Sequence, residues 1–141
     1  IRSRGLGDVY KRQSLYYIVG TEISHTAKQF PNTIQHDFHE QIQSYVNKFD
    51  IVYSNSLDHS YNPYKALKTW TDQVNQGGML CIELATGAEN KMRELDPLEI
   101  SPKELTEIIE EEFGFFNNDF KVINRHHRTN SLLGIFRRWK D

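Results

Sequence analysis

The chain has 141 residues, which is enough for one domain at most. A hydrophobic fraction of 38% and an aromatic fraction of 12% suffice for a packed core, and a mean hydropathy of −0.66 favours a soluble chain. No apolar run approaches the roughly 20 residues of a transmembrane helix, so we expect no membrane partner. The single cysteine, Cys81, excludes an internal disulfide and suits a reducing cytoplasm, where we expect the protein to work.

The first residues do not read as natural protein sequence. Residues 3–13, SRGLGDVYKRQ, match one reading frame of a transposase-type sequencing-library adapter without a mismatch. We therefore expect residues 1–13 to be an artefact of an untrimmed metagenomic assembly, which excludes them from the fold. The natural domain would then occupy residues 14–141 and begin in the middle of its gene. A basic N-terminal arm and a glycine loop at residues 5–7 are the alternatives.

Charge argues weakly against binding to a phosphate backbone. The formal net charge is −2; without residues 1–13 the chain keeps 13 basic and 18 acidic residues, or −5. Basic patches at residues 125–128 and 137–140 leave nucleic acid open as a partner. For the first of these patches a solvated loop is the simpler interpretation.

Strand and helix patterns alternate along the first half of the chain. Apolar, β-branched runs predict strands, and apolar residues at helical spacing predict helices. The expected elements, in chain order, are a strand at residues 15–19, a helix at 25–30 capped by Ser24, a strand at 33–36, a helix at 39–48, a strand at 49–53 and a helix at 64–74. Gly77-Gly78 is expected to end the last of these helices.

The second half of the chain continues the alternation and closes with two strands. We predict a strand at residues 79–84, a polar loop at 87–99, a helix at 102–113, and strands at 120–124 and 132–139 joined by the turn at 129–131. Ser101-Pro102-Lys103-Glu104 is a capping box, and Gly114 stops that helix. The whole order predicts an α/β fold with a mostly parallel sheet, covered on both faces, and a C-terminal antiparallel hairpin.

Four features at the ends of the predicted strands point to one family. Glu22 follows the first strand, Asp37-Phe38 follows the second, DIVYSNSLDH spans residues 50–59, and GGMLCIE spans residues 77–83. In open α/β sheets, ligands bind past the C-terminal ends of strands. This order of motifs resembles that of class I S-adenosylmethionine-dependent methyltransferases over residues 15–139. The resemblance implies a Rossmann-like sheet and S-adenosyl-L-methionine as cofactor.

The resemblance also implies roles for individual residues. Glu22, with Ile23 beside it, would bind the ribose hydroxyls, because a carboxylate accepts two hydrogen bonds well. Asp37 would take the adenine amino group, and Phe38 would pack on the adenine ring. Alternatively, Glu22 is a solvated acid at a strand end, and Asp37 is a helix N-cap for the following segment.

The residues after the third strand would face the transfer site. Asn55 and Ser56 would border the methionine part of the cofactor, although both could be turn residues. Asp58 and His59 are the candidate catalytic pair, with the imidazole as general base for a hydroxyl or amine acceptor. A loop histidine that stabilises the start of a helix is the alternative.

We predict no metal centre. His36 and His39 on a strand exit point in different directions, and no cysteine or acidic cluster completes a ligand set. Cys81 lies in an apolar strand and is expected to be a buried structural thiol.

The family's first strand and glycine-rich loop are absent from this sequence. In the family's strand order that strand is central, between the strands here at residues 15–19 and 49–53, so two apolar strand edges lose their partner. We therefore expect the 141-residue chain, expressed alone, to be aggregation-prone, inactive, and unable to bind the cofactor measurably.

Two other classes of function stay open. One is a nicotinamide-dependent oxidoreductase of Rossmann type, in which Glu22 would follow an unseen glycine loop. The other is a non-catalytic binding domain of the same fold. The sequence does not identify the methyl acceptor, and a small molecule is slightly favoured.

Overall fold

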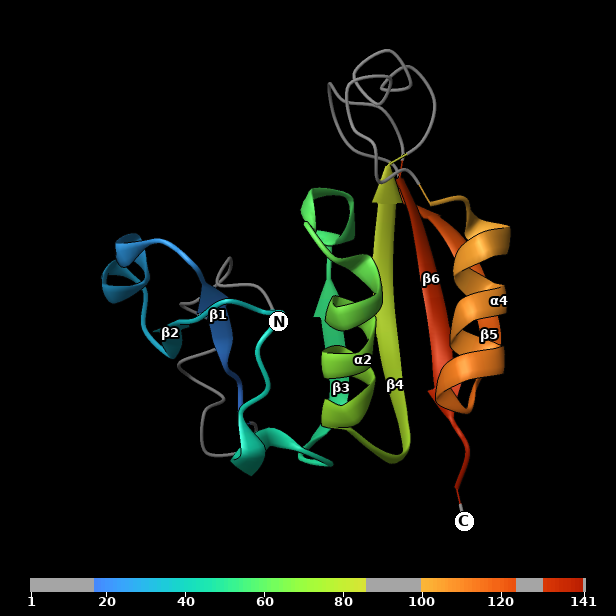
Figure 1. The fold of residues 1–141 in the computed structure, drawn as a ribbon, viewed down its shortest axis with the longest axis horizontal. Helices are drawn as coiled ribbons and strands as arrows, with labels where there is room; N and C mark the ends of the chain where they lie inside the picture. Colours follow the sequence, from blue (N-terminus) through green and yellow to red (C-terminus); the bar gives the residue numbers. More distant parts are fainter. Residues whose placement is uncertain (1–16, 86–99, 124–130, 141) are drawn as a thin grey trace. The chain divides into compact units, whose positions relative to one another are not determined.

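The computed structural model describes residues 17–85, 100–123 and 131–140. The chain divides into two compact units, Ile1–Glu40 and Gln41–Asp141. Each unit carries its own β-sheet (Figure 1). No helix of the described residues is long and apolar enough to cross a membrane. The predicted loop at residues 87–99 and the predicted turn at residues 129–130 lie outside the described residues.

The first unit is a pair of short parallel strands joined by a 3₁₀ helix. β1 (Gly20–Glu22) pairs in parallel with β2 (Thr33–Gln35). The 3₁₀ helix η1 (His25–Gln29) connects them, and the Ser24 hydroxyl caps it by accepting a hydrogen bond from the Thr26 backbone N–H. The predicted strand–helix–strand order and the Ser24 cap are confirmed, with a 3₁₀ helix where an α-helix was expected.

The first strand lies further along the chain than predicted. The apolar run predicted a strand at residues 15–19, but β1 begins at Gly20, and the described residues 17–19 lie outside it. Backbone pairing locates the strand: Gly20 N–H donates to the Asn32 carbonyl, and His36 N–H donates to the Glu22 carbonyl. Strand propensity is a weak preference, and the position of the partner strand overrides it.

The second unit contains a mixed four-stranded sheet. Its strands are β3 (Phe49–Ser54), β4 (Val74–Ala85), β5 (Phe115–Ile123) and β6 (Ser131–Arg138), in the spatial order β3-β4-β6-β5. β3 and β4 are parallel, whereas β6 lies between β4 and β5 and is antiparallel to both. The predicted parallel sheet with a C-terminal antiparallel strand is therefore confirmed. β1 and β3 each stand at the edge of their sheet.

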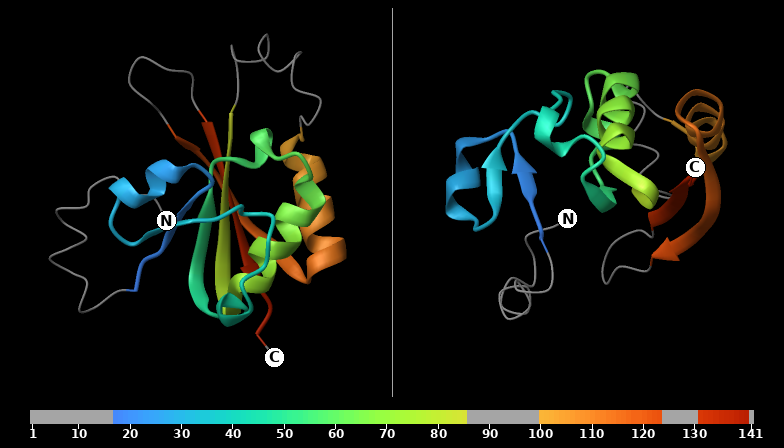
Figure 2. Two further views of the ribbon diagram at one scale, coloured as in Figure 1. Left: turned by 60° about the vertical axis from the view of Figure 1, so that its left-hand side comes forward. Right: turned by 90° about the horizontal axis from the view of Figure 1, so that it is seen from below.

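Two helices cover one face of the second sheet. α2 (Pro63–Gln73) packs on β3 and β4, and α4 (Pro102–Phe113) packs on β5 and meets α2 (Figures 1 and 2). The core between helices and strands consists of side chains at most 4% exposed: Ala66, Leu67, Trp70, Leu80, Ile82, Leu84, Leu105, Ile109, Phe115 and Phe136. Because strand side chains alternate between faces, Met79, Cys81 and Glu83 lie on the face opposite the helices.

The boundaries of α4 follow the sequence signals closely. The Ser101 hydroxyl accepts a hydrogen bond from Glu104 N–H at 3.1 Å, and Pro102 occupies the first turn. Gly114 ends the helix with a left-handed backbone, at φ 71°. The fixed φ angle of proline suits the first turn of a helix, and glycine adopts the left-handed backbone at the C-cap without steric cost. Both ends of α4 are therefore encoded by local sequence.

The predicted helix at residues 39–48 is wrong. Only the three residues of the 3₁₀ helix η2 (Gln43–Tyr45) are helical within this range. The segment has no side-chain N-cap at Ile42, and its end is held by backbone bonds to the end of α2: Asn47 N–H donates to the Asp72 carbonyl, and Lys48 N–H to the Gln73 carbonyl. These tertiary bonds replace the local ones that a short amphipathic helix would need.

The prediction that Gly77-Gly78 ends the preceding helix is also wrong. α2 ends at Gln73, and both glycines lie inside β4. Gly77 has φ 75°, and a Cβ atom on Gly78 would lie 2.8 Å from the Asp50 carbonyl oxygen. The pair therefore allows β4 to approach β3 closely, where their register shifts between Phe49 and Ile51.

Candidate functional site

Glu22 lies at the C-terminal end of β1, where the sequence predicted a ribose-binding acid. Its carboxylate Oε1 accepts a hydrogen bond from Ser24 N–H at 3.2 Å, and the residue is exposed. The neighbouring Ile23 is 66% exposed, and its carbonyl accepts a bond from Gln35 Nε2 at 3.2 Å. The exit of β1 is thus held in place from β2 while the carboxylate stays accessible to solvent.

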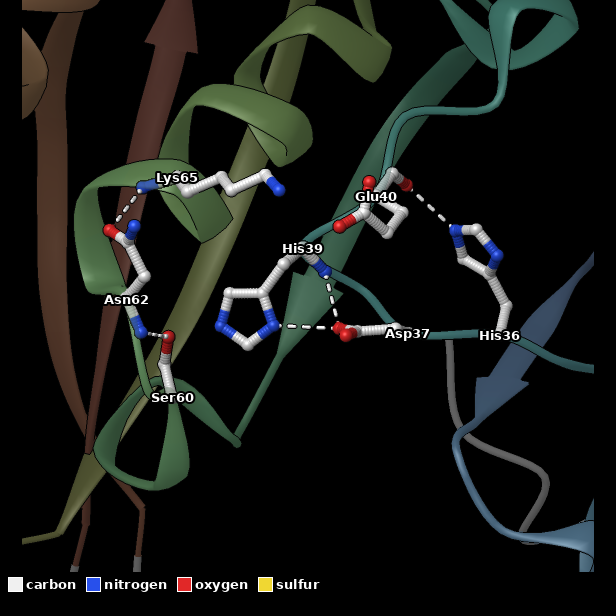
Figure 3. A network of polar contacts seen from close by, with 7 residues as sticks. All are labelled: His36, Asp37, His39, Glu40, Ser60, Asn62 and Lys65. Atoms are coloured by element: carbon white, nitrogen blue, oxygen red, sulfur yellow. Dashed lines mark hydrogen bonds and ion pairs between the residues drawn. The ribbon is translucent and has the colours of Figure 1, made fainter.

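Asp37 follows β2 and forms a tight turn with His39. Its Oδ1 accepts from His39 N–H at 2.9 Å and lies 2.7 Å from His39 Nδ1 (Figure 3). His39 is only 3% exposed, and its ring lies 4.5 Å from the ring of Phe38. Asp37 therefore closes a turn with His39. The alternative that Asp37 is the N-cap of a following helix is wrong, because the next helical residues are Gln43–Tyr45.

His36 and His39 are held by the backbone and by Asp37. His36 Nε2 lies 2.7 Å from the Glu40 carbonyl, whereas His39 contacts Asp37 (Figure 3). Among the described residues, no group of three or more His, Cys, Asp and Glu is placed to hold a metal ion.

The exit of β3 in the second unit is a compact polar turn. Ser54 Oγ accepts from Ser56 N–H at 3.1 Å, and Asn55 Oδ1 accepts from Ser56 Oγ at 3.1 Å. The 3₁₀ helix η3 (Leu57–His59) follows, with Leu57 buried to 1% exposure. Burial of Leu57 fixes the path of the turn, and it keeps Asn55 and Ser56 at the C-terminal end of the parallel pair β3–β4.

The candidate catalytic pair lies within η3. Asp58 is half-buried and His59 is exposed. His59 N–H donates to the Ser56 carbonyl, which joins the histidine to the polar turn. Asn62 then caps α2 by accepting from Lys65 N–H, and Ser60 Oγ accepts from Asn62 N–H at 3.1 Å (Figure 3). This chain of caps fixes the backbone around His59.

A tyrosine–glutamate pair that the sequence analysis missed lies at the same end of the second sheet. Tyr53 OH donates to Glu83 Oε1 at 2.9 Å and so joins the C-terminal parts of the strands β3 and β4. Tyr53 is opposite Cys81 in the parallel register, so Glu83 reaches back along its strand to the phenol. An acid within the otherwise apolar run MLCIELA was the available signal.

Cys81 is a structural thiol, as predicted. It is 9% exposed, within β4. Burial raises the pKa of the Cys81 thiol above its ordinary value of 9.0, and the nearby Arg137 guanidinium lowers it to a smaller extent. The thiol is therefore protonated near neutral pH and is a poor nucleophile.

The predicted site residues all follow the C-terminal ends of parallel strands. Glu22 is the last residue of β1, and Asp37 follows the adjacent strand β2 by two residues. Asn55 and Ser56 belong to the second unit, with Asp58 and His59 in the helix after them. The structure thus gives two groups of polar residues, one in each unit. Each group lies at the C-terminal ends of parallel strands, which is where ligands bind in open α/β folds.

Comparison with known proteins gives the class of fold. No family model matches the chain, and no curated protein matches it either. Solved structures do match. The chain is similar to the 1,6-didemethyltoxoflavin-N1-methyltransferase of Burkholderia thailandensis, with 13% identity and a TM-score of 0.69 over 97% of this chain and 68% of that one.

Two further structures match equally well. A S-adenosylmethionine-dependent methyltransferase of Methanosarcina mazei has 13% identity and a TM-score of 0.70, over 95% of this chain and 87% of that one. The [4+2]-cyclase SpnF has 12% identity and a TM-score of 0.71, over 99% of this chain and 72% of that one. The chain has the fold of class I S-adenosylmethionine-dependent methyltransferases, as its strand-end motifs predicted.

Proposed function

We propose that this chain belongs to an enzyme that transfers a methyl group from S-adenosylmethionine to an acceptor. The observation that carries the proposal is the placement of Glu22 and Asp37 after adjacent parallel strands of this fold. Bound S-adenosylmethionine would supply a methyl group activated on a sulfonium. The chain's own residues would hold the nucleoside and align the acceptor, since methyl transfer depends mainly on positioning.

The accessible carboxylate of Glu22 fits a pair of hydroxyl donors. Ser24 N–H orients Oε1, so the carboxylate presents its remaining acceptor positions in a fixed direction. Ile23 is exposed beside it and offers an apolar surface to the sugar. Glu22 would therefore bind the ribose hydroxyls, and Ile23 would contact the same part of the cofactor.

Asp37 and Phe38 would bind the adenine. The contact with His39 fixes the Asp37 carboxylate, which would accept a bond from the adenine amino group. Phe38 lies next to it and would pack on the ring. Asn55 and Ser56 would border the methionine part of the cofactor from the exit of β3.

His59, with Asp58, would act at the acceptor. The exposed imidazole at the end of η3 could take the proton of a hydroxyl or amine acceptor during transfer. A small-molecule acceptor is slightly favoured, and the acidity of residues 14–141 supports it. Among similar structures, the Burkholderia enzyme contains a bound small molecule, whereas another is named as a 16S rRNA methyltransferase, so nucleic acid stays open.

Titration with S-adenosylhomocysteine tests the proposal. The source locus, sequenced without transposase adapters, gives the uninterrupted gene and tests whether residues 1–13 are foreign. We expect the protein encoded by this gene to bind S-adenosylhomocysteine, with the affinity measured by calorimetry. Glu22→Gln and Asp37→Asn each weaken binding about 10- to 100-fold, because a hydrogen bond to a charged group contributes roughly 1.5–3 kcal/mol.

Glu111→Gln is the matched control, because Glu111 is an exposed acid on α4 that is assigned no role. Unchanged affinity in both site variants would contradict the proposed roles. Tight binding of a nicotinamide dinucleotide, with none of S-adenosylhomocysteine, would favour the oxidoreductase. Micromolar binding by the 141-residue chain alone would contradict our expectation that this chain does not bind the cofactor measurably.

A further inference from the structure

The outer edge of β5 is a surface on which another strand could pair. Among the described strands, β5 lies at the end of the second sheet, beside β6 (Figure 1). It spans nine residues, Phe115–Ile123. In an antiparallel strand, every second residue directs its N–H and C=O groups to the neighbouring strand, and the residues between direct theirs to the open side. Open groups of this kind bind strands of other copies unless a structural feature prevents it.

Two backbone amides of β5 donate to carboxylates instead of to β6. Asn117 N–H donates to Glu110 Oε1, on α4, at 3.0 Å. Phe120 N–H donates to Asp119 Oδ1 at 2.8 Å. Both bonds are exposed to solvent, whereas an amide that pointed to β6 would donate to a backbone carbonyl of that strand. The open edge of β5 therefore includes the amides of Asn117 and Phe120.

The spacing of these two amides agrees with the register of the sheet. Amides on one side of a regular strand are an even number of residues apart, but Asn117 and Phe120 are three apart. The register of β5 against β6 shifts between Asn117 and Asp119. These two residues are opposite Phe136 and Ile135, which are neighbours in β6. The extra residue of this bulge brings both amides to the same side of β5.

We propose that Glu110 and Asp119 prevent β5 from pairing with a second copy of this chain, because they occupy two of its open amides. An approaching strand would place its carbonyl oxygens opposite carboxylates instead of N–H donors. The oxygen atoms of both groups carry negative charge, and moving the carboxylates aside would break two charge-assisted hydrogen bonds. This role does not depend on the reaction that the parent enzyme catalyses.

Charge alone would not keep two copies apart. Lys121 Nζ lies 3.6 Å from Asp119 Oδ2, and the two side chains are 62% and 49% exposed. Two copies paired antiparallel about Phe120 would bring each Asp119 opposite Lys121 of the other copy, and such cross-strand pairs of opposite charge are favourable. Occupation of the amides is therefore the feature that a variant has to remove.

Sedimentation velocity at increasing concentrations of the protein encoded by the uninterrupted gene tests the proposal. The double variant Glu110→Ala/Asp119→Ala frees both amides, and we expect its self-association constant to rise at least about 10-fold above that of the natural protein. Glu110→Gln/Asp119→Asn removes the same two charges but keeps a carbonyl oxygen that can accept from each N–H. This amide variant should associate as weakly as the natural protein. Each single alanine variant frees one amide and should give a smaller increase.

The matched control is Asp72→Ala/Glu111→Ala, which also removes two acids. Asp72 pairs with Lys68 at 2.9 Å, as Asp119 pairs with Lys121, and Glu111 is an exposed acid on α4. Self-association of this control should equal that of the natural protein.

Amide hydrogen exchange locates the interface in the alanine variants. The amides of residues 117 and 120 should become more protected as the protein concentration rises. Unchanged self-association of the alanine variants would overturn the proposal. Equal self-association of the alanine and amide variants would also overturn it, because charge would then be the cause. Protection confined to other strands would do the same, since the copies would then meet at a different surface.

Discussion

The two units of the chain differ in how much of their structure is buried. In the second unit, β4 alone spans 12 residues, and four of its side chains, Val74, Leu80, Ile82 and Leu84, are at most 1% exposed. In the first unit, both strands span three residues, and Ala27 is the one buried apolar residue among those described. The second unit therefore has its own core, whereas the first is held mainly by backbone pairing and caps. Glu22 and Asp37, which we propose to bind the nucleoside, belong to the unit with fewer buried apolar side chains.

The largest expected effect is the loss of a core side chain from the second unit. Phe136 is fully buried on β6, between β4 and β5. Phe136→Ala should lower the free energy of unfolding by about 3–5 kcal/mol, because it leaves a cavity in addition to the lost transfer energy. Chemical denaturation followed by tryptophan fluorescence measures it.

The control is Val122→Ala on the neighbouring strand. Val122 is 63% exposed, and its truncation should change stability by less than about 0.5 kcal/mol. Similar effects for the two variants would mean that the second unit has no specific core, and the contrast with the first unit would disappear.

A smaller effect is expected from removing the helix caps, one in each unit. Ser101 caps α4 of 12 residues, whereas Ser24 caps η1 of five. Ser101→Ala should lower the free energy of unfolding by about 1 kcal/mol. Ser24→Ala should change the global value much less, and should instead increase amide hydrogen exchange locally at Thr26 and Ala27. An equal global loss in both variants would show that the two units unfold as one.

The smallest expected effect is the pH dependence from Cys81. Burial raises the pKa of this thiol in the folded state, so the unfolded chain loses the proton first as pH rises above 9.0. The contribution of Cys81 is therefore fully present below pH 9.0 and falls as pH rises above it. Denaturation at pH 7, 9 and 10 should show a steeper decline for the natural chain than for Cys81→Ala. If the free energy of unfolding fell equally with pH in both proteins, the Cys81 thiol would be as accessible to solvent in the folded chain as in the unfolded chain.

Local signals predicted the elements that they encode directly. Ser101, Pro102 and Gly114 gave both ends of α4. The acids Glu22 and Asp37 were located at strand ends because a carboxylate after an apolar run is visible in the sequence.

Features that depend on distant partners were not predicted. Ile42, Tyr45 and Val46 have helical spacing, but backbone bonds to Asp72 and Gln73 hold the nearby chain in a different path. The Tyr53–Glu83 bond depends on the register between β3 and β4, which joins residues 30 positions apart. The sequence shows both residues and does not show that they meet.

The position of β6 also determines the order in which the molecule can be made. Among the described strands, β6 is the last in sequence order, yet it separates β4 from β5, which are both synthesised before it. While the ribosome still holds residues 131–138, one edge of β4 and one edge of β5 have no partner strand. Nascent chains are therefore exposed to mispairing until residues 131–138 have emerged, and chaperone demand should depend on how quickly they emerge.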